Sequence, residues 1–152
     1  MKEIKIKTNK KLKLINCIEC GFDPTQGVQQ NKIRQQMVNY IKRKGLNQVG
    51  PFITFSKLEV DNTQMTLLSK FLLQVDQNGI QIEEPYKFTS EIFIENCIMA
   101  EFYDYANYMQ LAYQKISVYA YEHELKLRGD KYTVFLKESE HILVHIFMPI
   151  LN

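Results

Sequence analysis

Asn16-Cys17-Ile18 recurs as Asn96-Cys97-Ile98, and the pattern that follows each copy recurs as well. Each copy precedes a run with helical periodicity, a Leu, a Gly four residues beyond it and then aromatic residues. These are Leu46, Gly50, Phe52 and Phe55 after the first copy, and Leu125, Gly129, Tyr132 and Phe135 after the second. A unit of about 80 residues is too small to bury much core alone, so we expect two such units to share one sheet. The seam between them is then the natural position for a ligand cleft.

Both copies predict the order strand, helix, strand, strand. The first predicted helix carries a stripe of Ile33, Met37, Tyr40 and Ile41. Asp104 is the expected N-cap of the second. The first copy predicts a strand at 11–20, a helix at 29–44 and strands at 51–58 and 65–75. The second predicts a strand at 92–102, a helix at 104–124 and strands at 131–137 and 143–150.

The economical arrangement of these elements is an α+β fold. In it, a tandem strand-helix-strand-strand pseudo-repeat forms one mostly antiparallel sheet, with two helices on one face and a cleft on the other. We expect residues 1–152 to form a single domain, with repeat one at about 11–75 and repeat two at about 88–150. A junction hairpin is expected at about 76–86, because Asn78-Gly79 is a strong tight-turn pair.

The composition argues against several classes of partner. A net charge of +2 on 152 residues gives no electrostatic basis for nucleic-acid binding. The lysines of residues 1–13 alternate with apolar residues, as on the wet face of an edge strand. No apolar run approaches the ~20 residues of a membrane span, and the lysine-rich start contains no signal-peptide core. We therefore expect a cytoplasmic protein with no nucleic-acid and no membrane partner, whose oligomeric state the sequence leaves open.

His145 and Phe147 are the first candidates for a binding site. They are two apart on a predicted strand, so their side chains point to the same face. The residues between and beside them, Val144, Ile146 and Met148, make the other face wholly apolar, and that face should carry the helices. His145 and Phe147 are therefore expected in the cleft, as a polar anchor beside an aromatic wall. The alternative is a cleft-facing histidine that is satisfied by a neighbour or by water.

Glu101 and Tyr103 cluster where the second repeat enters its helix. A carboxylate beside a phenol could bind a polar or cationic ligand, although a solvated strand end is an open alternative. Phe55, Tyr132 and Cys97, from the recurring motifs, complete the predicted ligand-binding set.

No cofactor, metal or catalytic residue is expected. His141 and His145 would stand ~13 Å apart on a strand, too far for one metal ion. Cys17 and Cys20 form a lone Cys-x-x-Cys on a strand, and zinc would need a second pair. Three cysteines fit reduced thiols better than a disulfide framework, although a pairing of Cys17 with Cys97 is conceivable.

The chain resembles the GyrI-like family, also known as AraC-type effector-binding or multidrug-sensor domains. Gly45-Leu46, Gly50-Pro51 and Phe55 are similar to the family's Gly-Leu, Gly-Pro and aromatic pattern after the first helix. The closing residues 144–150 look like the family's terminal Thr-Glu-Ile-Tyr-Ile-Pro-Val. The resemblance covers nearly the whole chain and implies a tandem strand-helix-strand-strand fold with an effector-binding cleft.

One departure from the family pattern decides the order of the functional hypotheses. Family members that bind lipophilic cations, or act as hydrolases, carry a Glu where this chain has His145, and a neutral imidazole does not neutralise a cation. We rank first a stand-alone module that binds a small amphipathic or aromatic ligand in the cleft between the repeats. A protein-interaction or inhibitor module with a degenerate cleft is second, because the second predicted helix is rich in Tyr. A small hydrolase is third, so an enzyme is the less favoured interpretation.

Overall fold

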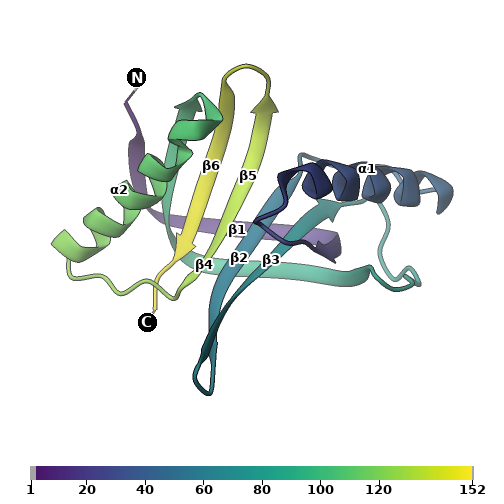
Figure 1. Ribbon diagram of the computed structural model, residues 1–152, viewed down its shortest axis with the longest axis horizontal. Helices are drawn as coiled ribbons and strands as arrows, with labels where there is room; N and C mark the ends of the chain where they lie inside the picture. The colour runs from purple at the N-terminus through teal and green to yellow at the C-terminus, as the bar shows by residue number, and fades with distance from the viewer. Residues whose placement is uncertain (1–2, 152) are drawn as a thin grey trace. The chain divides into compact units, whose positions relative to one another are not determined.

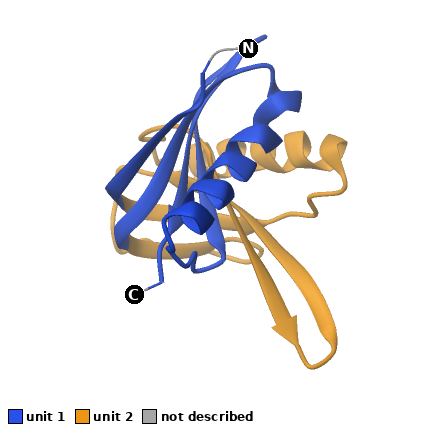
Figure 2. Cartoon of the chain, turned by 90° about the vertical axis from the view of Figure 1, so that its left-hand side faces the viewer, with its two compact units in different colours: residues 1–12, 93–152 blue, residues 13–92 orange. Residues whose placement is uncertain are grey.

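The computed structural model describes residues 3–151 and divides the chain into two compact units (Figure 2). Unit 1 comprises residues 1–12 and 93–152, and unit 2 comprises residues 13–92. The elements in chain order (Figure 1) are β1 (Lys5–Gly21), α1 (Gly27–Arg43), β2 (Ile53–Asp61), β3 (Gln64–Gln74), β4 (Lys87–Asp104), the 3-10 turn η1 (Ala106–Tyr108), α2 (Met109–Glu122), β5 (Asp130–Glu138) and β6 (Ile142–Pro149). The strands of each unit pair antiparallel, which confirms the expected α+β class.

In unit 2, α1 packs on an antiparallel sheet in which β3 lies between β1 and β2. Side chains two apart on a strand share a face, so Ile18 of β1 and Phe71 and Leu73 of β3 join one core cluster. Met37 and Ile41, from the predicted apolar stripe of α1, complete this cluster with exposed fractions of 0% and 2%. The predicted inner face of the first helix is therefore confirmed.

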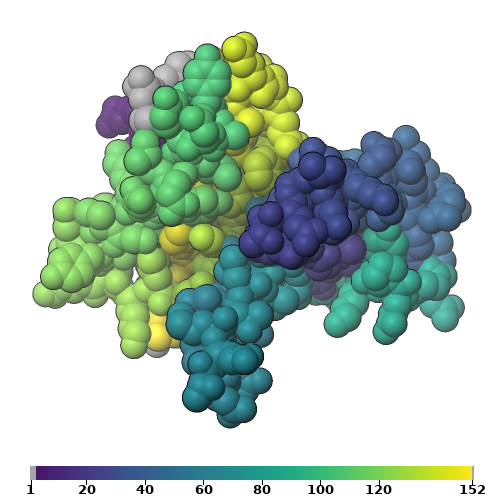
Figure 3. All heavy atoms as spheres, viewed as in Figure 1, coloured from purple at the N-terminus to yellow at the C-terminus, as the bar shows by residue number. Residues whose placement is uncertain are grey.

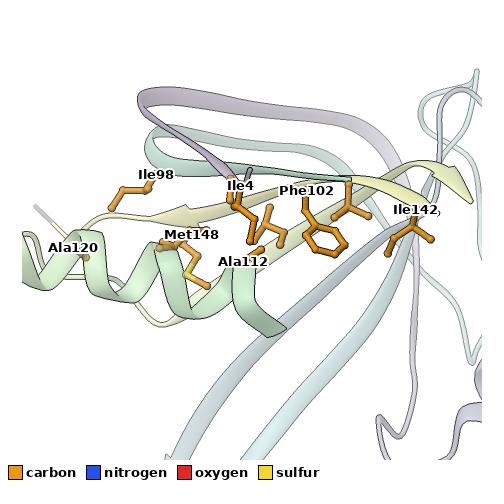
Figure 4. Close-up of a cluster of buried hydrophobic side chains, with 11 residues drawn as sticks. Ile4, Ile98, Phe102, Ala112, Ala120, Ile142 and Met148 are labelled. Carbon is orange, nitrogen blue, oxygen red and sulfur yellow. The ribbon is translucent and has the colours of Figure 1, made fainter. Parts of the chain in front are cut away.

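In unit 1, α2 packs on an antiparallel sheet in which β6 lies between β4 and β5. Figure 4 shows Ala112 and Ala120 of α2 beside Ile98 and Met148 of the strands. Ile4, just before β1, packs on the same core. β1 itself begins at Lys5, earlier than the expected residue 11. The apolar face predicted for the last strand is the face that carries α2.

Both helices end with the same backbone hydrogen bond. After α1 the N–H of Leu46 donates to the carbonyl of Ile41 at 2.8 Å, and after α2 the N–H of Leu125 donates to the carbonyl of Ala120 at the same distance. Gly45, just before Leu46, takes a φ of +73°. A bond of this span over a left-handed residue is a Schellman helix ending. Leu recurs at the point where the chain leaves each helix.

The recurring Asn residues hold the end of the last strand in each unit. The N–H of Val75 donates to the carbonyl of Asn16 at 3.0 Å, and the N–H of Ile150 donates to the carbonyl of Asn96 at 3.0 Å. Each of these bonds ties the end of the last strand of a repeat to the strand with which that repeat begins, β1 in the first and β4 in the second. The two units thus make matching backbone hydrogen bonds at the residues where the sequence pattern recurs.

The expected junction hairpin is wrong, because residues 76–86 form no strand. Asn78-Gly79 does make a turn, in which the Asn78 side-chain oxygen accepts from the N–H of Gly79 at 2.8 Å. Ile80 and Ile82, which follow the turn, do not form a strand. Their side chains pack against the core of unit 2. The alternation of Ile80 and Ile82 suggested strand pairing in a hairpin. Their partial burial against the core takes its place.

The expected N-cap is also wrong. Asp104 is the last residue of β4, and its carboxylate accepts from the N–H of Tyr105 at 2.7 Å. The turn η1 separates it from α2, which begins without a side-chain cap at Met109. The Asp104 carboxylate therefore bonds to the next residue and does not cap α2.

Replacing Ile116 by Ala should lower the free energy of unfolding by about 2–5 kcal/mol, because a fully buried side chain leaves a cavity when it is truncated. Val118 lies on the same helix and is 54% exposed, so Val118→Ala is the matched control and should stay within about 0.5 kcal/mol of wild type. Urea denaturation followed by circular dichroism measures both variants. Equal losses in the two variants would contradict the packing of α2 in unit 1.

Candidate functional site

Six of the seven predicted site residues lie in unit 1. The strand registers set Glu101 opposite His145 and Tyr132 opposite Phe147, and residues directly opposite each other share a face. The intervening residues form the core beneath α2, so these four lie on the side of the sheet away from α2. We call this surface, defined by Glu101, Tyr132, His145 and Phe147, the polar face of unit 1. Cys97 shares it but is fully buried, and Tyr132 is itself only 6% exposed.

Glu101 is held by a cation that the sequence analysis did not assign to the site. Lys7 Nζ donates to Glu101 Oε1 at 2.8 Å, and His145 Nε2 lies 3.9 Å from the same oxygen. The second distance is too long for a hydrogen bond. The hydrogen bond from Lys7 and its positive charge hold the pKa of Glu101 below its ordinary value. At neutral pH the polar face therefore carries a carboxylate that already has its counter-ion.

His145 is partly buried, with 30% of its side chain exposed, and is flanked by an aromatic ring. Burial is the largest influence on its pKa and lowers it from the ordinary value; the Glu101 carboxylate raises it in part, while Lys7 and Lys10 lower it further. The ring centroids of His145 and Phe147 are 6.5 Å apart at an interplanar angle of 67°, an edge-to-face arrangement. A neutral imidazole offers one donor and one acceptor nitrogen, so His145 suits recognition of a polar group better than charge neutralisation.

A hollow of about 300 Å³ opens beside Glu101 in unit 1. It is lined by Glu3, Lys5, Glu101, Phe102, Tyr103 and Leu143. Tyr103 is thus placed beside Glu101, as the sequence analysis expected. His141 stands close by, with its ring centroid 5.6 Å from that of Tyr103 and 4.3 Å from that of Tyr105. The volume is at the lower end of the range for ligand pockets, so it suits a small molecule or one group of a larger one.

Phe55, the seventh predicted residue, belongs to unit 2. Lys70 Nζ lies 5.4 Å from the centroid of its ring and 3.1 Å from Glu19 Oε1. The hydroxyl of Thr89 also donates to Glu19, whose side chain is only 13% exposed. Glu19 lies between Cys17 and Cys20 in the sequence and is not among the predicted site residues. The signal in the sequence that could have identified Glu19 is a single acidic residue within an otherwise apolar stretch of strand.

Unit 2 has a second hollow that the sequence did not indicate. It measures about 790 Å³ and is lined by Gln36, Asn39, Tyr40, Lys42, Arg43, Glu84, Pro85 and Tyr86. The rings of Tyr40 and Tyr86 stack at a centroid distance of 4.3 Å, and Tyr40 donates a hydrogen bond to Glu83. The stacked rings and their neighbours thus form one wall of a broad polar depression beside α1.

The cysteines have the properties of buried thiols. All three are free, and burial raises the pKa of Cys17 to about 12 and that of Cys97 to about 11. A thiol with such a pKa holds almost no thiolate at neutral pH, so it is a poor nucleophile. Within residues 3–151, no three His, Cys, Asp or Glu side chains gather as a metal site would need. The helices in the same residues are all too short or too polar to cross a membrane.

No protein-family model and no curated protein matches the sequence. Solved structures do match. The C-terminal domain of EcmrR has a TM-score of 0.71 at 13% identity, covering 99% of this chain and 98% of that one. In the EcmrR–DNA complex the TM-score is 0.72 at 12% identity, and this chain spans 57% of the EcmrR chain. SAV2435 bound to tetraphenylphosphonium has a TM-score of 0.50 at 14% identity, covering 99% of this chain and 95% of that one. These similarities establish a shared fold.

The lowered pKa of His145 predicts a loss of stability in mild acid. As the pH falls through about 6.5, the ordinary histidine pKa, the unfolded chain takes up a proton before folded His145 does. The stability contributed by the neutral imidazole is therefore present above this pH and lost as the pH falls through the folded pKa. Urea unfolding at pH 7.5 and 5.5 should show a smaller acid loss in His145→Gln than in wild type. His123→Gln, at an exposed position after α2, is the control and should retain the wild-type loss.

Proposed function

We propose that this chain is a ligand-binding module of the effector-binding type, and that the polar face of unit 1 takes a small amphipathic or aromatic ligand. The observation that carries the proposal is the grouping of Glu101, Lys7 and His145 beside the rings of Phe147 and Tyr132. Polar groups that fix orientation next to aromatic walls are typical of small-molecule sites. The hollow of about 300 Å³ beside Glu101 provides space for part of such a ligand.

The shared fold supports the class of function. EcmrR is a DNA-binding protein with a C-terminal domain of this fold, and SAV2435 binds tetraphenylphosphonium. The resemblance to GyrI-like domains, drawn from the sequence motifs, points to the same class. The position of the ligand at the seam of the two repeats, the single-domain organisation, the cytoplasmic location and the absence of nucleic-acid binding all stay predictions.

The charges on the polar face argue against a lipophilic cation as the ligand. A cation that used Glu101 would have to displace Lys7 from a hydrogen bond of 2.8 Å. It would also approach Lys5, which lines the same hollow. Like charges at such distances repel. An uncharged amphipathic molecule meets neither cost, so we place it ahead of a cation.

A protein-interaction module is the second candidate, and α2 is the reason. Tyr121 is 86% exposed and Val118 is 54% exposed on this helix. Tyr is one of the residues enriched at interfaces. A small hydrolase ranks third, because a neutral His145 beside an ion-paired Glu101 provides no activated nucleophile of its own.

Ligand binding should appear as thermal stabilisation. A compound at one hundred times its Kd stabilises the folded state by about 2.7 kcal/mol. We expect uncharged amphipathic aromatics to raise the Tm of wild type, and Phe147→Ala to remove the shift. Tyr121→Ala is the control and should respond as wild type does. If no compound shifts wild type, or if Tyr121→Ala rather than Phe147→Ala removes the shift, the polar face is not the site.

Releasing Glu101 should create affinity for a cation. Lys7→Met removes the counter-ion, and tetraphenylphosphonium should then raise the Tm of the variant while leaving wild type unchanged. Lys11→Met removes an exposed lysine of the same strand and should behave as wild type. Equal binding of the cation to all three proteins would contradict the role assigned to the Lys7–Glu101 pair.

A further inference from the structure

The outer part of the β2–β3 hairpin carries an apolar stripe on one side. This ribbon projects beyond the other strands of unit 2 (Figure 2), and its tip forms a teal lobe in the space-filling view (Figure 3). Leu58 pairs with Leu67 and Val60 pairs with Met65, so all four side chains share one face. Their exposed fractions are 48%, 47%, 70% and 67% in that order. Solvent-exposed apolar side chains have thus gathered on a two-stranded ribbon, which by itself is only marginally stable.

Among residues 3–151, no strand pairs with the outer edge of this ribbon. β1 pairs with β3 only from Lys70 to Gln74, and the last contact before the tip is the bond from the N–H of Phe22 to the carbonyl of Ser69 at 3.0 Å. In residues 3–151, the pairing on this side of β3 therefore stops at Ser69. The outward backbone groups of residues 64–68 are left to solvent, and such an edge is a template for another strand.

The chemistry of the edge favours a second copy of the same strand. Residues 64–69, Gln-Met-Thr-Leu-Leu-Ser, contain no charge and no proline, so the edge lacks the usual devices that prevent pairing. In a two-fold antiparallel pair, each residue lies opposite itself or its symmetric neighbour. Any charge on the edge would then face a like charge, and here there is none. The backbone groups of two identical antiparallel edges are complementary by construction.

We propose that residues 64–68 of β3 pair antiparallel with the same residues of a second copy of this chain, forming a continuous sheet of two hairpins. Four strands replace two, which relieves the marginal stability of the isolated ribbon. Met65 and Leu67 of each copy then pack across the new strand pair. An edge of about five residues makes a small interface, so the dimer is weak and concentration-dependent.

Sedimentation velocity of the full chain over roughly 1–500 µM tests the proposal, at concentrations that span weak self-association. The weight-average mass should rise from 18.0 kDa toward twice that value. Leu67→Lys places a lysine on the pairing edge and should abolish the rise. Leu58→Lys is the matched control, because Leu58 is the register partner of Leu67 with nearly the same exposure, but lies on β2.

Two further measurements secure the result. Thr66→Lys places the new charge opposite Glu59 within the hairpin, so it should fold, and it should also abolish the dimer. Hydrogen exchange of the amides in residues 64–68 should slow with rising protein concentration in wild type. A monomer at every concentration would overturn the proposal, as would equal effects of Leu58→Lys and Leu67→Lys, which would make the apolar side of the ribbon the interface rather than its edge.

Discussion

The two-residue alternation of the strands in unit 1, with a helix covering only one side, is the constraint on which the candidate site depends. Burying Val144 and Ile146 beneath α2 forces His145 and Phe147 to the opposite side. The core and the polar face are thus two consequences of one strand geometry. A shift of one residue in register would exchange them, which ties the site to the packing of α2.

On the polar face, charge decides the chemistry more than shape does. Lys7 pairs with Glu101, and burial keeps His145 neutral. The Glu101 carboxylate on this surface is therefore already paired with a cation at neutral pH. Aromatic rings of Phe147 and Tyr132 stand beside these groups, so the face combines orientation by hydrogen bonds with apolar contact. The proposal of an amphipathic ligand rests on this combination.

Unit 2 uses the same backbone hydrogen bonds for a different surface. The bonds at Leu46 and Val75 match those at Leu125 and Ile150 of unit 1. Its Glu19 is nevertheless paired with Lys70 and largely shielded, and its β2–β3 ribbon extends into solvent with an unpaired edge. Because backbone bonds specify the scaffold without specifying side chains, the two units differ in surface chemistry while keeping the same local turns.

The sequence by itself determined what depends on neighbours along the chain. Helical periodicity predicted the buried face of α1, and strand alternation placed His145 opposite the apolar side of β6. Only the tertiary structure decided the ion pair of Lys7 with Glu101, which joins residues 94 positions apart, and the burial of Ile80 against the core of unit 2 instead of in a hairpin. Periodicity is a local property that one strand or helix expresses alone. A partner across the sheet depends on strand order and register, which the whole core settles together.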